Sequence, residues 1–265
     1  MNYKIIGEDV DTYAQNCEDL ILEVLLPKKK GFYVDVGANL PDSNSVTKLF
    51  YNKGWRGINI EPIPWLYKHL AEERLDDINL NIGIANKTGM LKLREYEDIP
   101  DWSTFSNVVK NLDSRQKHPY KEYNVQVRPL MEIFEENKVK DIDFLKVDVE
   151  GFEYQVLISN DWRRWRPTVV VVENSAGKWM GLMKKLGYRE VFFDGLNRYF
   201  VTSAIQGELI LKDYSRKNIL LSKKSKRRLF IASLLDKISM RLPIPLLNKL
   251  SKFKRWMSRK LKKQK

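Results

Sequence analysis

The chain has 265 residues, of which 43% are hydrophobic and 31% are charged, a composition that suits one globular domain with an appendage. Its one cysteine, Cys17, excludes a disulfide framework within the chain and favours a reducing, intracellular setting. No run approaches the roughly 18 apolar residues of a membrane span, and the first residues lack the apolar stretch of a signal peptide. We therefore expect a cytoplasmic protein.

The positive charge is concentrated in the C-terminal part of the chain. The net charge is +13 overall, but residues 212–265 hold 19 Lys or Arg against two acids, a net charge of +17, whereas residues 1–211 carry −4. We predict a globular domain over residues 1–211 and a basic tail over residues 212–265. The basicity then describes the partner of the tail and not the ligand of the domain.

The first half of the domain alternates between strand-like and helix-like segments. Residues 31–39 form a short apolar run that ends in Asp and Gly, which predicts a buried strand entering a loop. The segments that follow are expected to be a helix over 42–52, a strand over 56–60, a helix over 64–74 and a strand over 78–84.

The second half begins with an irregular segment over 89–128, with strand-like stretches at 89–94 and 123–128. The remaining expected elements are helices over 129–137, 152–158 and 176–186, strands over 142–148 and 168–172, and a closing antiparallel hairpin of strands 188–193 and 197–201. Alternation of strands and helices predicts an α/β fold, with a mostly parallel sheet covered on both faces.

Acidic side chains follow four of the predicted strands. They are Asp35, Glu61, the pair Asp148 and Glu150, and Glu173. Ligands of an open parallel sheet bind beyond the carboxyl ends of its strands, so these acids are expected at a binding edge. Like charges gathered there are unfavourable unless cationic or hydrogen-bonding ligands meet them. The alternative for Asp35 and Glu173 is that each merely caps a helix.

Four residues are the candidate cofactor-binding set: Asp35, Gly37, Asn39 and Glu61. Gly37 would let the backbone approach a ligand closely, although a plain turn is the alternative, and Glu61 stands where an acceptor for a ribose diol belongs. The Gly-Ala-Asn loop lacks the further glycines that a pyrophosphate needs, which disfavours a dinucleotide. S-adenosylmethionine has no phosphate and needs fewer glycines.

Three longer motifs resemble the FkbM-type methyltransferase family. They are Phe32-Tyr-Val-Asp-Val-Gly-Ala-Asn39, Gly54-Trp-Arg-Gly-Ile-Asn-Ile-Glu61-Pro62 and Ile142-Asp-Phe-Leu-Lys-Val-Asp-Val-Glu-Gly-Phe-Glu153. The segments Tyr13–Asp19 and Trp102–Ser106 are also similar, so the resemblance covers residues 12–202. It implies a class I, Rossmann-like methyltransferase sheet with a closing antiparallel strand, S-adenosyl-L-methionine as cofactor, and O-methylation of a hydroxyl, commonly on a sugar. Leu40-Pro41-Asp42 departs from the family pattern after Asn39.

A sugar hydroxyl is a poor nucleophile, and removal of its proton would assist attack on the sulfonium-activated methyl group. Glu150 and Glu173 are the candidate bases, with Asp148 third. Carboxylates can also bind a divalent ion, and the residue types alone do not separate a base from a metal ligand. The predicted site therefore includes no metal.

Residues outside these motifs offer weaker alternatives. His118 lies in the irregular segment expected to cover the site, where it is a further candidate base. Ser103, Thr104 and Ser106 could bind acceptor hydroxyls or form a plain loop cluster. Cys17 is better interpreted as a packed thiol than as a nucleophile.

The basic tail has two apolar stripes at helical spacing. The first lies within 229–242 and ends at Pro243 and Pro245, and the second, over 246–261, is surrounded by Lys and Arg. This profile is typical of a helix lying in an anionic membrane surface. A helix that docks on a partner and a disordered tail are the alternatives. Nucleic acid is disfavoured because the few aromatic residues lie on the apolar stripe.

The sequence thus predicts an O-methyltransferase that acts on a sugar of a polysaccharide or lipid-linked glycan, peripheral on the inner face of the membrane. The alternative is a non-catalytic Rossmann-like scaffold whose tail recruits glycan-assembly enzymes. Acids at four strand ends favour the enzyme, because a scaffold has no need of them. A third possibility, RNA methylation, is supported by the charge alone.

Overall fold

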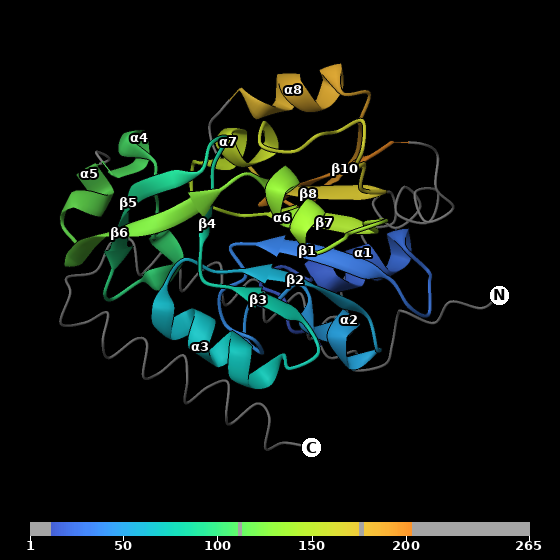
Figure 1. Cartoon of the computed structure of the whole chain (residues 1–265), viewed down its shortest axis with the longest axis horizontal. Helices are drawn as coiled ribbons and strands as arrows, with labels where there is room; N and C mark the ends of the chain where they lie inside the picture. Colours follow the sequence, from blue (N-terminus) through green and yellow to red (C-terminus); the bar gives the residue numbers. More distant parts are fainter. Residues whose placement is uncertain (1–11, 111–112, 175–177, 203–265) are drawn as a thin grey trace. The chain divides into compact units, whose positions relative to one another are not determined.

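The computed structural model describes residues 12–110, 113–174 and 178–202 (Figure 1). The predicted tail and the predicted boundary near residue 211 lie outside these residues. The described chain is built on a seven-stranded sheet of order β3-β2-β1-β7-β8-β10-β9. Its strands are β1 (Phe32–Val36), β2 (Arg56–Ile60), β3 (Ile78–Leu80), β7 (Phe144–Val147), β8 (Val169–Glu173), β9 (Arg189–Phe193) and β10 (Asn197–Val201).

The first five strands in this order are parallel, and β10 pairs antiparallel with both β8 and β9. This confirms the predicted α/β fold with a mostly parallel sheet and a closing antiparallel pair. The helices of eight or more residues are α1 (Glu18–Leu25) and α3 (Pro64–Glu73). The shorter ones are α2 (Lys48–Asn52), α4 (Asn107–Lys110), α5 (Asp113–Gln116), α6 (Leu130–Glu136), α7 (Glu153–Leu157), α8 (Trp179–Lys185) and the 3-10 turn η1 (Pro100–Trp102). No helix among the described residues is long and apolar enough to cross a membrane.

Alternation along the strands divides the core into two layers. Val34 and Val36 of β1 belong to an apolar cluster that also holds residues of α6, α7 and α8. Because successive side chains of a strand point to opposite faces, Tyr33 and Asp35 face the other way. There Tyr33 stacks on Phe144 at 5.6 Å between ring centroids, and Phe50 of α2 packs on Phe144 at 5.0 Å. Asp35 thus lies on the aromatic face of the sheet.

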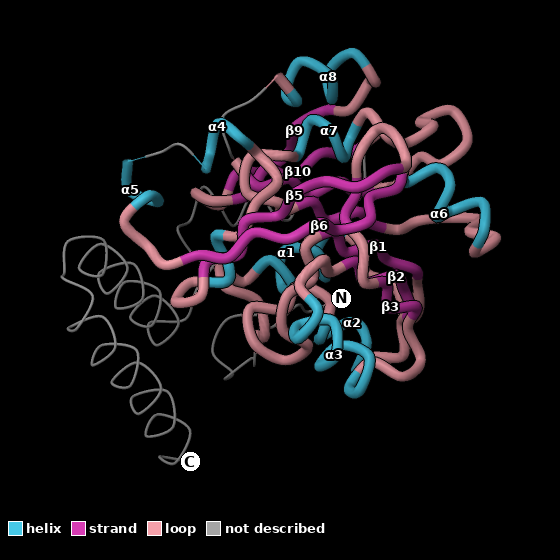
Figure 2. Tube along the Cα trace, turned by 60° about the vertical axis from the view of Figure 1, so that its left-hand side comes forward, coloured by secondary structure: helices cyan, strands magenta, loops and turns pink. Residues whose placement is uncertain are grey.

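A second sheet, of order β4-β6-β5, confirms the strand-like stretches predicted at 89–94 and 123–128 and corrects the prediction that residues 89–128 are otherwise irregular. Its strands are β4 (Gly83–Ile84), β5 (Gly89–Tyr96) and β6 (Tyr120–Arg128), and β5 pairs antiparallel with β6 along its whole length. Figure 2 shows β5 and β6 running side by side, with α4 and α5 in the connection between them. This connection, residues 97–119, carries the Trp102–Ser106 motif.

The expected single strand over 78–84 is wrong, because the chain changes sheets within it. β3 ends at Leu80 and pairs with β2, whereas β4 begins at Gly83 and pairs with β6. Between them, the amide Nδ2 of Asn81 donates to the carbonyl of Glu61 at 2.8 Å. A Cβ at Gly83 would lie 2.7 Å from the ring of Phe105, so the absence of a side chain permits this crossing.

The expected helix over 42–52 is also wrong in its first half, since α2 begins only at Lys48. Asn44 adopts a left-handed conformation with φ 56°. The N–H of Ser45 donates to the carbonyl of Tyr13 at 3.0 Å, and its hydroxyl accepts a hydrogen bond from Arg74 at 2.9 Å. These tertiary hydrogen bonds replace the helical ones that the local sequence favours.

Candidate active site

Strand register brings Asp35 and Lys146 together at the carboxyl end of the sheet. They are direct neighbours on β1 and β7, on the same face. The ammonium of Lys146 lies 3.3 Å from Oδ1 of Asp35 and 3.5 Å from Oδ2 of Asp148, and it donates to the carbonyl of Gly37 at 2.7 Å. Both Asp35 and Lys146 are buried. Two of the strand-end acids therefore share one lysine.

This lysine supplies charge compensation that the sequence interpretation did not consider. Burial alone would lower the pKa of Lys146, but the carboxylates of Asp35 and Asp148 raise it overall above its ordinary value. Burial raises the pKa of Asp35, and the charge of Lys146 opposes that rise. The signal was present in the sequence, since a lysine stands in the middle of the apolar strand over 142–148.

Gly37 has a packing role at the same junction. Its φ is +80°, and a Cβ there would lie only 1.9 Å from the carbonyl oxygen of Asp148, a backbone atom. Its N–H donates to the carbonyl of Ile60 at 3.0 Å. Only glycine lets the loop after β1 approach the end of β7 this closely. Contact of Gly37 with a ligand stays a prediction.

Glu61 fixes the loop that follows β1. Its Oε2 accepts the N–H of Asn39 at 2.9 Å and its Oε1 accepts the N–H of Ile63 at 2.9 Å. The side chain is buried, and burial raises the pKa of Glu61 to about 7. Asn39 is left-handed, with φ 55°, and its Nδ2 donates to Asp101 of η1 at 2.8 Å. Each carboxylate oxygen of Glu61 keeps a lone pair for a further donor.

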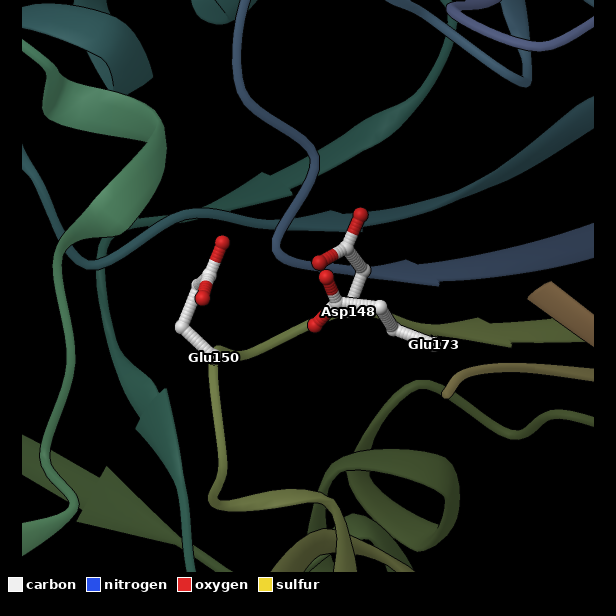
Figure 3. A group of neighbouring side chains, drawn as sticks. All are labelled: Asp148, Glu150 and Glu173. Carbon is white, nitrogen blue, oxygen red and sulfur yellow. The ribbon is translucent and has the colours of Figure 1, made fainter. Parts of the chain in front are cut away.

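Asp148, Glu150 and Glu173 form one cluster, defined here as the carboxylate cluster (Figure 3). One ligand oxygen from each of the three side chains lies within 4.8 Å of the other two. Asp148 directly follows β7 and Glu173 ends β8, and these strands are parallel neighbours in register at Val147 and Val172. The sheet therefore brings the three predicted catalytic residues together.

Two carboxyl groups of the carboxylate cluster, those of Glu150 and Glu173, have raised pKa values. Burial raises the pKa of Glu173 to about 10, with added repulsion from Asp148 and then Glu150. Burial and Asp148 raise the pKa of Glu150 to about 7, against the lowering effect of Arg115. Oε2 of Glu173 is buried and has no hydrogen-bond partner among the described residues. With a pKa of about 7, Glu150 can take up a proton near neutral pH, whereas Glu173 already holds one there. The spacing of the oxygens in the carboxylate cluster also suits a divalent cation.

Arg115 is a second cation that sequence reasoning missed. Its Nη2 lies 2.5 Å from Oε2 of Glu150, and its Nη1 donates to the carbonyl of Trp102. The guanidinium lies 4.9 Å from the centroid of the Trp102 ring. Arg115 belongs to α5 in the connection between β5 and β6, whose pairing the sequence did not reveal.

The hydroxyls of the Trp102–Ser106 motif fasten this connection to the site. Thr104 is buried, and its Oγ1 donates to the carbonyl of Glu150 at 2.8 Å while accepting the N–H of Ser106 at 2.8 Å. The hydroxyl of Ser103 accepts the N–H of Tyr96 at 3.3 Å. Thr104 and Ser103 thus bind protein groups, as the plain loop alternative requires.

The remaining candidates, His118 and Cys17, contact other parts of the domain. Nδ1 of His118 lies 2.8 Å from Oδ2 of Asp98, and its ring is 5.2 Å from that of Trp102. Burial raises the pKa of the Cys17 thiol to about 12, which suits the interpretation as a packed thiol.

Comparisons with known proteins agree with the resemblance in the sequence. The model of the family described as Methyltransferase FkbM domain matches residues 35–190. Among solved structures, the chain is similar to a precorrin-6y C5,15-methyltransferase from Geobacter metallireducens GS-15, with 14% identity, a TM-score of 0.38, and coverage of 77% of this chain and 100% of that chain. A search of curated proteins gave no significant match. The matched range contains each predicted site residue, from Asp35 to Glu173.

Proposed function

The chain belongs to the FkbM methyltransferase family, and on this premise we propose that it is an S-adenosylmethionine-dependent O-methyltransferase acting on a sugar hydroxyl of a polysaccharide or lipid-linked glycan. One observation carries the proposal. A buried, hydrogen-bonded loop at Glu61 and a cluster of three carboxylates at Asp148, Glu150 and Glu173 stand at the same edge of the sheet. The first suits a ligand with vicinal hydroxyls and the second suits proton transfer.

The residues present fit the proposed cofactor. Glu61 is oriented by two backbone N–H groups and can accept ribose hydroxyls with its remaining lone pairs. Carboxylates at the ends of β1, β7 and β8 suit a ligand that carries positive charge. The loop from Gly37 to Asn39 has no glycine-rich cradle for a pyrophosphate, which a phosphate-free cofactor does not need. Asp35, Gly37, Asn39 and Glu61 are the residues assigned to hold it.

S-adenosylmethionine supplies a methyl group that its sulfonium charge has already activated. The chain then has two tasks, which are to align the acceptor and to accept its proton. Glu150 and Glu173 are the proposed bases, with Asp148 third. The raised pKa of Glu150, about 7 because of burial, suits a group that must gain a proton during the reaction near neutral pH.

The experiment is methyl transfer from isotopically labelled S-adenosylmethionine to glycans isolated from a strain lacking the gene. We expect incorporation of label, and mass spectrometry of the deletion-strain glycan should show the loss of one methyl group. Calorimetry with S-adenosylhomocysteine tests cofactor binding separately. Binding without transfer to any glycan fraction would favour a non-catalytic scaffold, whereas loss of both would refute the cofactor assignment.

We further propose that residues 212–265 hold the enzyme on an anionic membrane surface. The support is compositional, namely a net charge of +17 beside two apolar stripes. Deletion of residues 226–265 should release the protein from anionic vesicles without changing its affinity for S-adenosylhomocysteine. Raised salt should weaken vesicle binding only in part, and replacing Phe253 and Trp256 with serine should remove the remainder. A truncated protein still bound to vesicles would contradict this proposal.

A further inference from the structure

The backbone of Glu150 is held in an uncommon conformation. Its φ is +53°, in the left-handed region that residues with a side chain rarely adopt. Such a conformation persists only where the surroundings impose it. The carbonyl of Glu150 accepts the hydroxyl of Thr104 at 2.8 Å. At the next residue, Gly151, a Cβ would lie 2.4 Å from the side chain of Val109, so this turn is packed closely against the β5–β6 connection.

The side chain of Glu150 is held by the same connection. Nη2 of Arg115 lies 2.5 Å from Oε2 of Glu150, with side chains that are 12% and 19% exposed. Arg115 is itself fixed, because its Nη1 donates to the carbonyl of Trp102 and its guanidinium lies over the Trp102 ring. An ion pair this far removed from water, with both partners anchored, restricts the carboxylate to a narrow range of positions.

The two cations at this edge of the sheet, Lys146 and Arg115, pair with different acids. Lys146 pairs with Asp35 and Asp148, and Arg115 pairs with Glu150. Glu173 forms no ion pair with another described residue. Burial is the main cause of its raised pKa, and the neighbouring carboxylates raise it further. Without Arg115, the carboxylate of Glu150 would face Asp148 and Glu173 with no cation paired to it.

We propose that Arg115 is a positioning residue for methyl transfer, which aims the Glu150 carboxylate at the acceptor by holding its Oε2. This inference rests on the proposed function. Because Oε2 is occupied, Oε1 takes the hydroxyl proton as the new carbon–oxygen bond forms and the carbon–sulfur bond breaks. The products are the methyl ether, S-adenosylhomocysteine and protonated Glu150. Arg115 touches neither substrate and acts through Glu150 alone.

A double-mutant cycle tests this assignment in the full-length protein. Arg115→Met should lower kcat by about 10–100-fold with the KM for S-adenosylmethionine nearly unchanged, because only the base is misplaced. In the Glu150→Gln background the same substitution should have almost no further effect on kcat. Arg115→Lys should recover part of the loss, since it restores the charge without the planar guanidinium.

Arg94 offers a matched control in the neighbouring strand β5. It pairs with Glu122 at 2.9 Å and lies 4.0 Å from the centroid of the Tyr120 ring, much as Arg115 pairs with Glu150 and lies over Trp102. Arg94→Met should leave kcat close to the wild-type value. Equal losses of kcat from Arg94→Met and Arg115→Met would indicate a merely structural role.

The outcomes separate this inference from the proposed function. If Arg115→Met lowers kcat equally with and without Glu150→Gln, Arg115 does not act through Glu150 and the inference is overturned. If the wild-type protein transfers no methyl group to any glycan, the proposed function fails first. Should Arg115→Met fail to fold, Arg115→Gln keeps a donor for Trp102 without the charge, and the same cycle is run with it.

Discussion

The carboxyl end of the sheet has two halves, one at the ends of β1 and β2 and the other at the ends of β7 and β8, and they are built in different ways. In the first half, Asp35 and Glu61 are buried, and both carboxylate oxygens of Glu61 accept backbone N–H groups, those of Asn39 and Ile63. In the second half, Asp148, Glu150 and Glu173 are partly exposed and face one another, and Glu150 depends on Arg115 and Thr104 from the connection between β5 and β6. Backbone N–H groups therefore orient Glu61 in the first half, whereas an arginine and a threonine from a distant segment hold Glu150 in the second.

This difference suits two different tasks. A site that must recognise one constant ligand gains from a rigid backbone that is complete before binding. A site that must move a proton needs side chains whose charge can change, and clustered carboxylates with raised pKa values provide this. We expect substitutions in the second half to affect turnover and substitutions in the first half to affect affinity.

The largest effect is expected from Glu150→Gln, which keeps the shape of the side chain and removes its charge. We expect kcat to fall by about 10²–10⁴-fold, because the base is lost, while affinity for S-adenosylhomocysteine changes little. Transfer assays and calorimetry on the same preparation check both parts. A variant with near-normal turnover would move the role of base to Glu173 or His118.

Lys146→Met should damage both halves, because Lys146 joins them. Asp35 and Asp148 would lose their shared cation in a buried setting, and we expect the free energy of unfolding to fall by about 3–5 kcal/mol. Urea denaturation measures this loss. Adding Asp35→Asn to Lys146→Met removes one of the two stranded charges and should recover part of the stability. No recovery would mean that Lys146 acts mainly through the carbonyl of Gly37.

Glu61→Ala should affect the first half alone. We expect binding of S-adenosylhomocysteine to weaken by about 1–3 kcal/mol, because two ribose hydroxyls would lose their acceptor. At saturating cofactor, kcat should stay close to the wild-type value. Calorimetry gives the first quantity and steady-state kinetics the second. Unchanged affinity in a folded variant would contradict the ribose assignment.

Glu61→Gln should reveal how much the buried negative charge of Glu61 destabilises the folded state. Burial raises the pKa of Glu61 from 4.5 to about 7, so the folded state binds its proton more tightly than the unfolded state does. A group of this kind makes the folded state less stable as pH rises between these two values. Glutamine cannot ionise, so the free energy of unfolding of the variant should rise by about 1–2 kcal/mol relative to that of the wild type as the pH increases from about 5 to about 8. Denaturation curves at the two pH values measure the change, and parallel behaviour of the two proteins would refute it.

The sequence predicted the position of the strand-end acids in both halves better than the contacts that hold Glu150, for a physical reason. Val169–Val172 and the run ending at Asp35 are continuous apolar segments of buried parallel strands, and an acid at the end of such a segment must lie at the edge of the sheet. The family resemblance supplied the cofactor, which periodicity alone does not name.

The strand-like stretches at 89–94 and 123–128 were predicted, but their pairing in a second sheet was not, because the strands are amphipathic, have few apolar residues and are separated by residues 97–119. The β5 strand begins with exposed residues, and the charged residues Lys92 and Arg94 alternate with Leu91 and Leu93. Its partner β6 starts with exposed Tyr120 and Lys121. Pairing between such segments depends on tertiary contacts that local patterns do not encode. Arg115 belongs to the connection between them, so its contact with Glu150 could not be inferred.

The β5–β6 hairpin has a consequence for protein engineering. It is inserted between β3 and β7 in the chain but leaves the order of the main sheet unbroken, and its own strands pair with each other and with β4. Residues 97–119 can thus be exchanged as a cassette between related enzymes while the framework from Asp35 to Glu61 is kept. We expect a library confined to this cassette to vary acceptor preference on a constant proposed cofactor site, provided that each graft retains Asp101 to hold Asn39, and a threonine and an arginine to anchor Glu150.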